Sequence, residues 1–362
     1  MNTLHIYLSN LKHNYETIRK QIHNSTQCIG VVKANAYGSH SLHFTKRLVE
    51  LGIDKLAVAY VEEGLQLREQ GIKTPIMVFY PQIKSIPELV GADLEPCIYS
   101  RELMDSFKLK LEAMKIKDYP IHIKYNTGLN RVGFPVIDVG WVLEKTKHPQ
   151  FRLESVYSHL AISEEERPSP QCTLQIKRFE EIKKKYTKLL KKAPKFHLLN
   201  SSGVFNYPDL QYDAVRCGIA FHGYANKLEW DVHLKPVAVL KSIISQIHQV
   251  KKSSSVGYDN GWIAPYAVRI ATLPLGHADG IGRHFGHHQS TVSINGYDAP
   301  IVGNVCMDML MIDVTGINCE TGDEVTFFDS SKSAEDFARS GNTISYELLT
   351  GIGPRIKRIL HQ

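Results

Sequence analysis

The sequence has no long hydrophobic run, since no apolar segment approaches the roughly 20 residues that a membrane-spanning helix needs. Residues 1–19 are mostly polar and lack the apolar core of a secretory signal. The six cysteines are scattered without a C-x-x-C pair, which argues against a disulfide framework and against a zinc site. We therefore expect a cytoplasmic protein without a metal centre.

An excess of charge of one sign is also missing. The formal net charge is +6 over 362 residues, and the lysine-rich stretches at 115–117 and 183–188 are typical of solvated helix faces. We expect neither nucleic acid nor a membrane as a partner. The glycine fingerprint of a dinucleotide-binding fold is absent as well, because Gly280-Ile281-Gly282 does not open a helix after a strand.

What the sequence does have is a regular alternation of short apolar runs and helical segments up to about residue 230. Strands are expected at 5–8, 28–32, 56–59, 76–79, 95–99, 121–125, 153–158 and 196–199. About eight strand–helix units over this length predict a (β/α)8 barrel of the TIM type, for which about 250 residues are typical.

From about residue 231 the pattern changes to short strands separated by Gly, Asn and Asp turns. These strands are expected at 237–240, 268–273, 291–294, 311–314 and 325–328, with helices at 333–339 and around 345–349. We therefore predict an α/β chain of two domains, a barrel over 1–230 followed by a mostly-β domain over 231–362.

One stretch of the expected barrel carries several residues that could take part in catalysis. The apolar, β-branched run 28–32 ends in Lys33, and a small-residue turn with Tyr37 and Gly38 follows. The carboxyl end of a barrel strand lies at the mouth where such folds hold their active sites. Partial burial there lowers the pKa of an amine, which suits a Schiff base with an aldehyde cofactor. An arbitrary strand-end lysine more often only reaches out to solvent.

Residues Val31–Gly38, VVKANAYG, resemble the cofactor-lysine motif of alanine racemases, and later stretches match in the same order over nearly the whole chain. The resemblance implies a pyridoxal 5′-phosphate (PLP) enzyme that interconverts L- and D-alanine and supplies D-alanine for peptidoglycan. It further implies that Lys33 holds the cofactor covalently and that Tyr37 contacts its phosphate.

Further cofactor contacts are implied in the later barrel segments. Ser201, expected near a helix N-terminus, is a sound phosphate ligand on physical grounds, although it could equally be only the helix cap. The resemblance favours the phosphate contact and adds the backbone amides of Gly218 and Ile219. It places His159 against the face of the pyridine ring. Arg216 corresponds to the arginine that faces the pyridine nitrogen, where a cation disfavours the protonated ring.

The segment 124–134 matches the family's strand and loop for substrate binding. The resemblance implies that Arg131 helps to hold the substrate carboxylate, a task that suits the fork of a guanidinium. Lys124 matches a lysine that is often carbamylated. Asn126 stands where an aspartate is common, so the local charge balance is expected to depend more on a carbamate.

The second domain is expected to supply another base. Residues 255–259 resemble the loop of the family's catalytic tyrosine, so Tyr258 would enter the active site of the partner subunit in a homodimer. Racemisation needs one base on each face of the substrate. The resemblance implies that Lys33 removes the proton of the D-isomer and that Tyr258 removes that of the L-isomer. It also implies that the Met307 amide binds the substrate carboxylate.

The chain departs from the family around the entrance to the site. His277 replaces a common tyrosine, whereas Arg283 is retained. Gly353-Pro354-Arg355 stands where many members place a tyrosine that contacts the phosphate, and Tyr346 is not assigned to that role. Strict specificity for alanine is therefore not implied.

Other interpretations stay open. One is a PLP-dependent racemase of broader specificity, or a related decarboxylase on the same barrel. Arg216 argues against a decarboxylase, which would be expected to keep an acidic residue at the pyridine nitrogen. Another is a non-catalytic PLP-binding barrel protein, and Tyr258 and Met307 argue against it.

Overall fold

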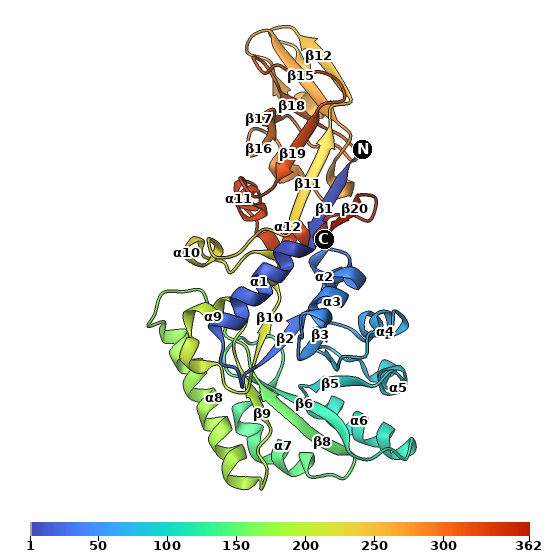
Figure 1. The fold of residues 1–362 in the computed structure, drawn as a ribbon, viewed down its shortest axis with the longest axis vertical. Helices are drawn as coiled ribbons and strands as arrows, with labels where there is room; N and C mark the ends of the chain where they lie inside the picture. The colour runs from blue at the N-terminus through green and yellow to red at the C-terminus, as the bar shows by residue number, and fades with distance from the viewer. Residues whose placement is uncertain (1) are drawn as a thin grey trace.

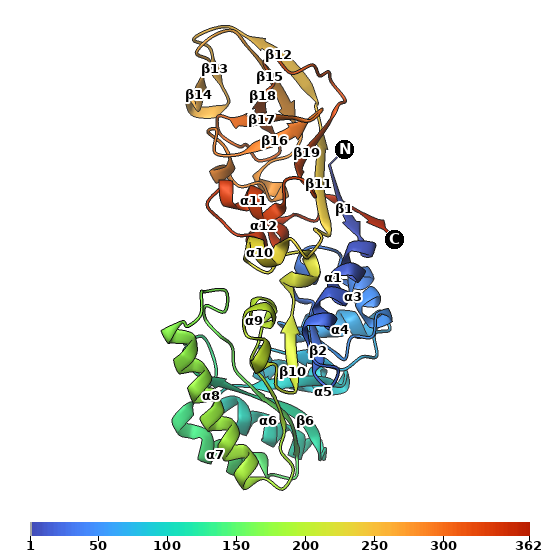
Figure 2. The same cartoon turned by 60° about the vertical axis from the view of Figure 1, so that its left-hand side comes forward.

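The computed structural model describes residues 2–362, which form two units arranged along the long axis of the molecule (Figure 1). The lower unit is a barrel and the upper unit is rich in β-structure, as the turned view also shows (Figure 2). No helix within residues 2–362 is long and apolar enough to cross a membrane.

Eight parallel strands close the barrel. Each strand pairs with the next, and the last pairs back with the first. In ring order they are β2 (Gln27–Val31), β3 (Lys55–Val58), β4 (Ile76–Val78), β5 (Leu94–Ile98), β6 (Tyr119–Asn126), β8 (Phe151–Tyr157), β9 (Lys195–His197) and β10 (Ala214–Cys217). The expected (β/α)8 barrel is confirmed.

Helices run between most of these strands and surround the barrel (Figure 1). They are α1 (Leu8–Gln21), α3 (Ser41–Glu50), α4 (Val61–Glu69), α5 (Ile86–Gly91), α6 (Arg101–Ala113), α7 (Val139–Thr146), α8 (Pro170–Leu189) and α9 (Ser201–Asn206). A two-residue strand, β7 (Phe134–Pro135), adds to the outer edge of β6.

The strand expected at 5–8 is present, but the prediction that it belongs to the barrel is wrong. β1 (Thr3–Tyr7) pairs antiparallel with β11 (Ala238–Ile243) and parallel with β20 (Lys357–His361), so it belongs to the second sheet. The eighth barrel strand is β10 instead. Burial gives the physical reason, because β1 alternates between half-buried and buried side chains whereas β2 is buried at four consecutive positions.

The second unit is built on a nine-stranded sheet in the order β12-β15-β18-β17-β16-β19-β11-β1-β20. Its remaining strands are β12 (Gln246–Val250), β15 (Val268–Leu273), β16 (Thr291–Ile294), β17 (Tyr297–Val302), β18 (Leu310–Asp313) and β19 (Glu324–Phe328). A short hairpin of β13 (Ser255–Val256) and β14 (Trp262–Ile263) lies beside it (Figure 2). Both expected helices are present as α11 (Ala334–Ser340) and α12 (Ser345–Gly351).

The last barrel strand ends at Cys217 and the second sheet resumes at Ala238, with the short helix α10 (Leu228–Asp231) between them. The division of the chain at residues 230 and 231 stays a prediction.

Candidate active site

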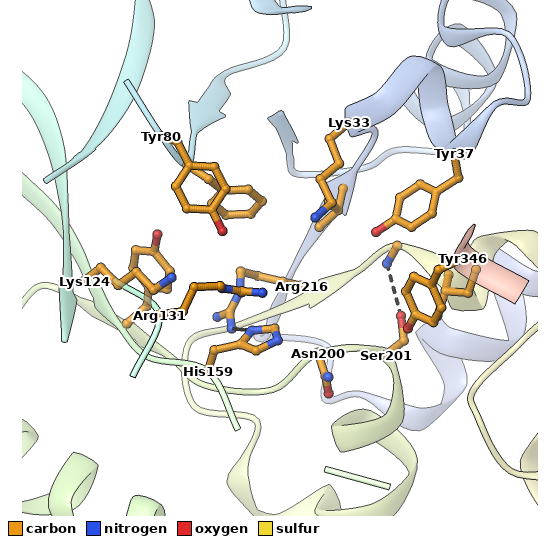
Figure 3. A pocket seen from close by; sticks show the side chains of 15 residues that line it. Lys33, Tyr37, Tyr80, Lys124, Arg131, His159, Asn200, Ser201, Arg216 and Tyr346 are labelled. Atoms are coloured by element: carbon orange, nitrogen blue, oxygen red, sulfur yellow. Dashed lines mark hydrogen bonds between the residues drawn. The ribbon is translucent and has the colours of Figure 1, made fainter. Parts of the chain in front are cut away.

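A cavity of about 250 Å³ lies at the carboxyl ends of the barrel strands, and Tyr346 of the second unit also lines it (Figure 3). It is lined by all nine barrel residues that the sequence analysis placed in the site: Lys33, Tyr37, Lys124, Arg131, His159, Ser201, Arg216, Gly218 and Ile219. Four of these side chains are cations, and no carboxylate is among the described residues that line the cavity. Such an excess of positive charge suits a ligand with several negative groups.

The backbone after Lys33 forms an unusual left-handed turn. Ala34, Asn35, Ala36 and Tyr37 have φ angles of 52°, 54°, 50° and 52°. This conformation costs roughly 1–2 kcal/mol for each residue that carries a Cβ. Four such residues in a row persist only where the surrounding structure holds them.

Glu63, in the first turn of α4, is one of the groups that hold this turn. One oxygen of its carboxylate accepts the backbone N–H of Ala34 at 2.6 Å. The other oxygen accepts the N–H groups of Ala59 at 2.7 Å and Tyr60 at 3.2 Å. Glu63 therefore joins the residue after Lys33 to the start of the next strand–helix connection.

The far end of the turn rests against the second unit. A Cβ at Gly38, where φ is 80°, would overlap the backbone carbonyl of Leu349 in α12. Arg358 of β20 donates to the Gly38 carbonyl at 3.2 Å. The position of Lys33 is therefore set from both units.

Lys33 points into the cavity and is half-buried (Figure 3). Burial lowers the pKa of its amine, and Arg131 lowers it further, while Glu63 acts in the opposite direction. A lysine whose neutral form is favoured in this way can serve both as a nucleophile and as a base.

Opposite Lys33, small and hydroxyl-bearing groups form a compact polar end of the cavity. The backbone N–H groups of Gly218 and Ala220 both donate to Ser201 Oγ, at 3.1 Å and 3.2 Å. A Cβ at Gly218 would overlap the Tyr37 hydroxyl, so only glycine allows that hydroxyl to lie there. Ile219, expected to contact the phosphate through its amide, also lines the cavity, and that role stays a prediction.

Tyr346 completes this end of the cavity, and the sequence analysis did not place it there. It lies on α12 of the second unit, with its ring 6.0 Å from that of Tyr37 and with Asn226 Nδ2 donating to its hydroxyl at 3.2 Å. Arg355, from the segment that stands in for the family's tyrosine, pairs instead with Asp279 and Asp308. Tyr346, which the sequence left unassigned, therefore lines the cavity, whereas the 353–355 segment does not.

Arg216 is 3% exposed, and its described partners are all neutral. It donates to Nδ1 of His197 at 2.8 Å and to Nδ1 of His159 at 3.1 Å. The carbonyls of Ser158 and Leu198 accept from it at 2.7 Å and 2.9 Å. Burial lowers the pKa of Arg216 to about 10, so it stays charged at neutral pH.

Both imidazoles beside Arg216 are neutral. Burial, followed by the charge of Arg216, holds the pKa of His159 and of His197 well below the usual value. From His197 the hydrogen bonds continue to Ser155 Oγ at 2.8 Å, on to His122 at 2.6 Å, and to Glu95 at 2.7 Å. Sequence reasoning missed this buried series, because hydrogen bonds between neighbouring barrel strands have no local sequence signature.

Lys124 is buried beside two aromatic rings. Its Nζ lies 5.7 Å from the ring centre of Tyr80 and 5.8 Å from that of Tyr157. Burial and then the charge of Arg131 lower its pKa to about 8. The sequence analysis missed Tyr80 and Tyr157, although each stands at or just after the end of a barrel strand.

Two expected site residues lie outside the barrel cavity. Tyr258 is 71% exposed and Met307 is 60% exposed, and both line an open hollow of about 570 Å³ on the second unit. This hollow shares no residue with the barrel cavity. His277, at the start of a short 3-10 turn, is exposed and bonds through its backbone N–H to the Cys306 carbonyl.

Comparisons with known proteins agree over both units. A family model for the N-terminal domain of alanine racemase matches residues 6–226, and one for the C-terminal domain matches residues 237–360. The alanine racemase of Clostridium kluyveri is 36% identical over 98% of this chain and 92% of its own length. Alanine racemase 2 of Caldanaerobacter subterraneus is 34% identical, covering 98% of this chain and 93% of its own.

Solved structures give the same result. The crystal structure of alanine racemase from D-cycloserine-producing Streptomyces lavendulae has a TM-score of 0.94 and 26% identity, with 100% of this chain and 97% of that chain covered. The fold, the lysine-bearing cavity and these matches together define an amino-acid racemase, an isomerase. The chain belongs to the alanine racemase family.

Proposed function

We propose that this chain interconverts L-alanine and D-alanine, with PLP held in the barrel cavity through Lys33. The observation that carries the proposal is the cavity itself, in which a lysine of lowered pKa lies together with a compact polar end and three further basic side chains. In cells the product would be D-alanine for peptidoglycan.

The residues present fit this cofactor. The hydroxyls of Ser201, Tyr37 and Tyr346 and the Gly218 amide would hold its phosphate, since these groups converge there and glycine at position 218 lets the Tyr37 hydroxyl come close. His159 would lie against the ring, and its neutral imidazole adds no charge there. When bound, PLP withdraws electrons from the substrate Cα and so makes the Cα–H bond acidic.

Arg216 would control how far this electron withdrawal goes. A guanidinium has only donors, and its charge disfavours a protonated pyridine nitrogen. The weaker electron sink that results favours return of a proton to Cα over side reactions such as transamination. The four neutral acceptors around Arg216 hold its plane in one orientation without cancelling its charge.

Two groups would move the proton. Lys33 takes the Cα proton of D-alanine, and Tyr258 takes that of L-alanine, with each returning a proton on its own face in the reverse direction. Because Tyr258 lies outside the barrel cavity of its own chain, it acts in the cavity of a second copy, which makes the active unit a homodimer. Arg131 and the Met307 amide would hold the substrate carboxylate.

A racemisation assay tests the function directly. The purified protein with added PLP should convert each enantiomer of alanine to the racemate and should act much less on serine or lysine. Comparable rates on all three would favour the broader-specificity racemase. No racemisation of any amino acid by protein with PLP bound would overturn the proposal and favour the non-catalytic PLP-binding protein.

We also propose that Lys124 is carbamylated. Carbamate formation needs a neutral amine, and a pKa of about 8 leaves a substantial neutral fraction near neutral pH. The product is an anion beside Arg131 and Arg216, where it would offset two of the cations that now repel the amine.

Removal of CO2 should therefore weaken the enzyme. In degassed, bicarbonate-free buffer we expect kcat/KM to fall about 10-fold, the value of one charge-assisted hydrogen bond, and added bicarbonate should restore it. At fixed dissolved CO2 the carbamate should increase as the pH rises through 8, because the neutral amine increases. The Lys124→Ala variant should have a low kcat/KM, and added bicarbonate should not change it. Carbon-13 NMR with labelled bicarbonate measures the carbamate, and its absence would contradict the assignment.

A further inference from the structure

The turn that carries Tyr258 is hydrogen-bonded through its backbone, because the Tyr258 carbonyl accepts from the Gly261 N–H and from Asn304. Tyr258–Asn260 form a single 3-10 turn between β13 and β14, and the tyrosine ring stands in solvent in the single chain. Asp259 and Asn260 both have positive φ angles, 58° and 49°. The direction of the Tyr258 side chain is therefore set by what the turn's backbone contacts.

Asn304 makes that backbone contact. It is 8% exposed and lies in the loop between β17 and β18. Its Nδ2 donates to the Tyr258 carbonyl at 3.0 Å. Its Oδ1 accepts from Arg283 at 2.7 Å and from His287 Nε2 at 3.0 Å.

The orientation of this amide is fixed by its partners. The Arg283 guanidinium can only donate and the Tyr258 carbonyl can only accept, so Oδ1 must face the arginine and Nδ2 the carbonyl. An aspartate at position 304 would keep the first contact and lose the second. An amide is the side chain of this size that satisfies both.

Two glycines let the turn pack closely, Gly261 against Asn304 and Gly257 against Met311. A Cβ at Gly261 would lie 2.8 Å from Asn304 Nδ2, and one at Gly257 would lie 2.8 Å from the Met311 methyl group. The loop of Asn304 also carries Met307, whose carbonyl accepts the Ala278 N–H at 3.0 Å. The amide therefore joins the loop of the tyrosine to the loop of the substrate-binding amide.

We propose that Asn304 is a positioning residue for Tyr258, fixing the tyrosine turn to the Arg283 loop so that the phenol meets the partner's cavity at one angle. Asn304 lies behind the turn and acts through Tyr258 without touching substrate. The inference rests on the proposed function, in which Tyr258 is the base for L-alanine.

The test is Asn304→Asp in the PLP-loaded enzyme, with deuterium exchange at Cα followed in D2O for each enantiomer. We expect racemisation to fall roughly 10- to 100-fold, the effect of a misplaced catalytic group. Exchange into L-alanine should fall in parallel, whereas exchange into D-alanine on the Lys33 face and the absorption of the bound cofactor should be nearly unchanged. A merely structural defect would lower both exchanges together.

Asn295→Asp is the matched control, because the exposed Asn295 also donates from Nδ2 to a backbone carbonyl at 3.0 Å, that of Asn318, in the same unit. It should leave both exchanges unchanged. Asn304→Ala serves if the aspartate variant does not fold. Equal loss from both enantiomers, or no loss, in either Asn304 variant overturns the positioning role. If Tyr258→Phe itself shows no difference between the enantiomers, the assignment of Tyr258 fails instead.

Discussion

Lys33→Ala should abolish racemisation and leave a protein that no longer shows the yellow absorption of lysine-bound PLP. On the proposed function, the substitution would remove the covalent attachment of the cofactor and the base for D-alanine at once. Loss of the base alone accounts for roughly 10²- to 10⁴-fold. The measurements are initial rates from each enantiomer and a visible spectrum after dialysis against PLP.

An unchanged spectrum in the Lys33→Ala variant would show that Lys33 does not bind the cofactor. Lys73→Ala is a suitable control, because Lys73 is exposed and precedes β4 at the opposite end of the strand from the cavity. It should retain both the rate and the absorption. Circular dichroism of the two variants should agree with that of the parent protein, since Lys33 is only half-buried and precedes the left-handed turn without being part of it.

Tyr258→Phe should lower racemisation by about 10²-fold or more, the contribution of one positioned base. The loss must be equal in both directions, because the two enantiomers have equal free energies and their kcat/KM values are therefore equal. Deuterium exchange does distinguish the faces. D-alanine should still acquire deuterium through Lys33 without inversion, whereas L-alanine should lose its exchange.

Mixing the two inactive proteins adds a test of the shared site. In a dimer of one Lys33→Ala chain and one Tyr258→Phe chain, one of the two cavities has both bases intact. Random reassociation should restore roughly a quarter of the parent activity in a symmetric dimer. No recovery after verified exchange of subunits would show that both bases come from one chain. Tyr266→Phe, at another exposed tyrosine near the hairpin, should be fully active.

The barrel side of the site was predicted mainly through the family resemblance, and the structure brings these residues together because they stand at or near strand ends. Lys33 follows β2 and Arg216 lies in β10. The carboxyl ends of parallel strands in a closed barrel all lie at the same end of the barrel, so these residues come close together. The predicted number of barrel strands was right, but one of the eight predicted strands, at 5–8, belongs to the second sheet. The strand at 5–8 reads as apolar, but its alternating burial belongs to a sheet with one covered face.

Other parts of the site depend on contacts that no local pattern announces. Four consecutive residues from Ala34 to Tyr37 adopt left-handed φ angles that alanine and tyrosine rarely take, and a tertiary hydrogen bond from Ala34 to Glu63 helps to hold the turn. Tyr346 enters from a helix far along the chain. Asn304 forms its three contacts across separate loops. Each depends on which segments the fold brings together.

The pairing of β1 with β20 bears on how the molecule assembles during synthesis. Thr3 lies opposite Lys357, so all of the sequence between these two residues must leave the ribosome before β20 can join the sheet. Loop closure over such a distance makes this a slow step compared with the local strand–helix units of the barrel. We expect α12, and with it Tyr346, to settle over the cavity only at that late stage, so a nascent barrel would bind the proposed cofactor weakly until β1 and β20 pair.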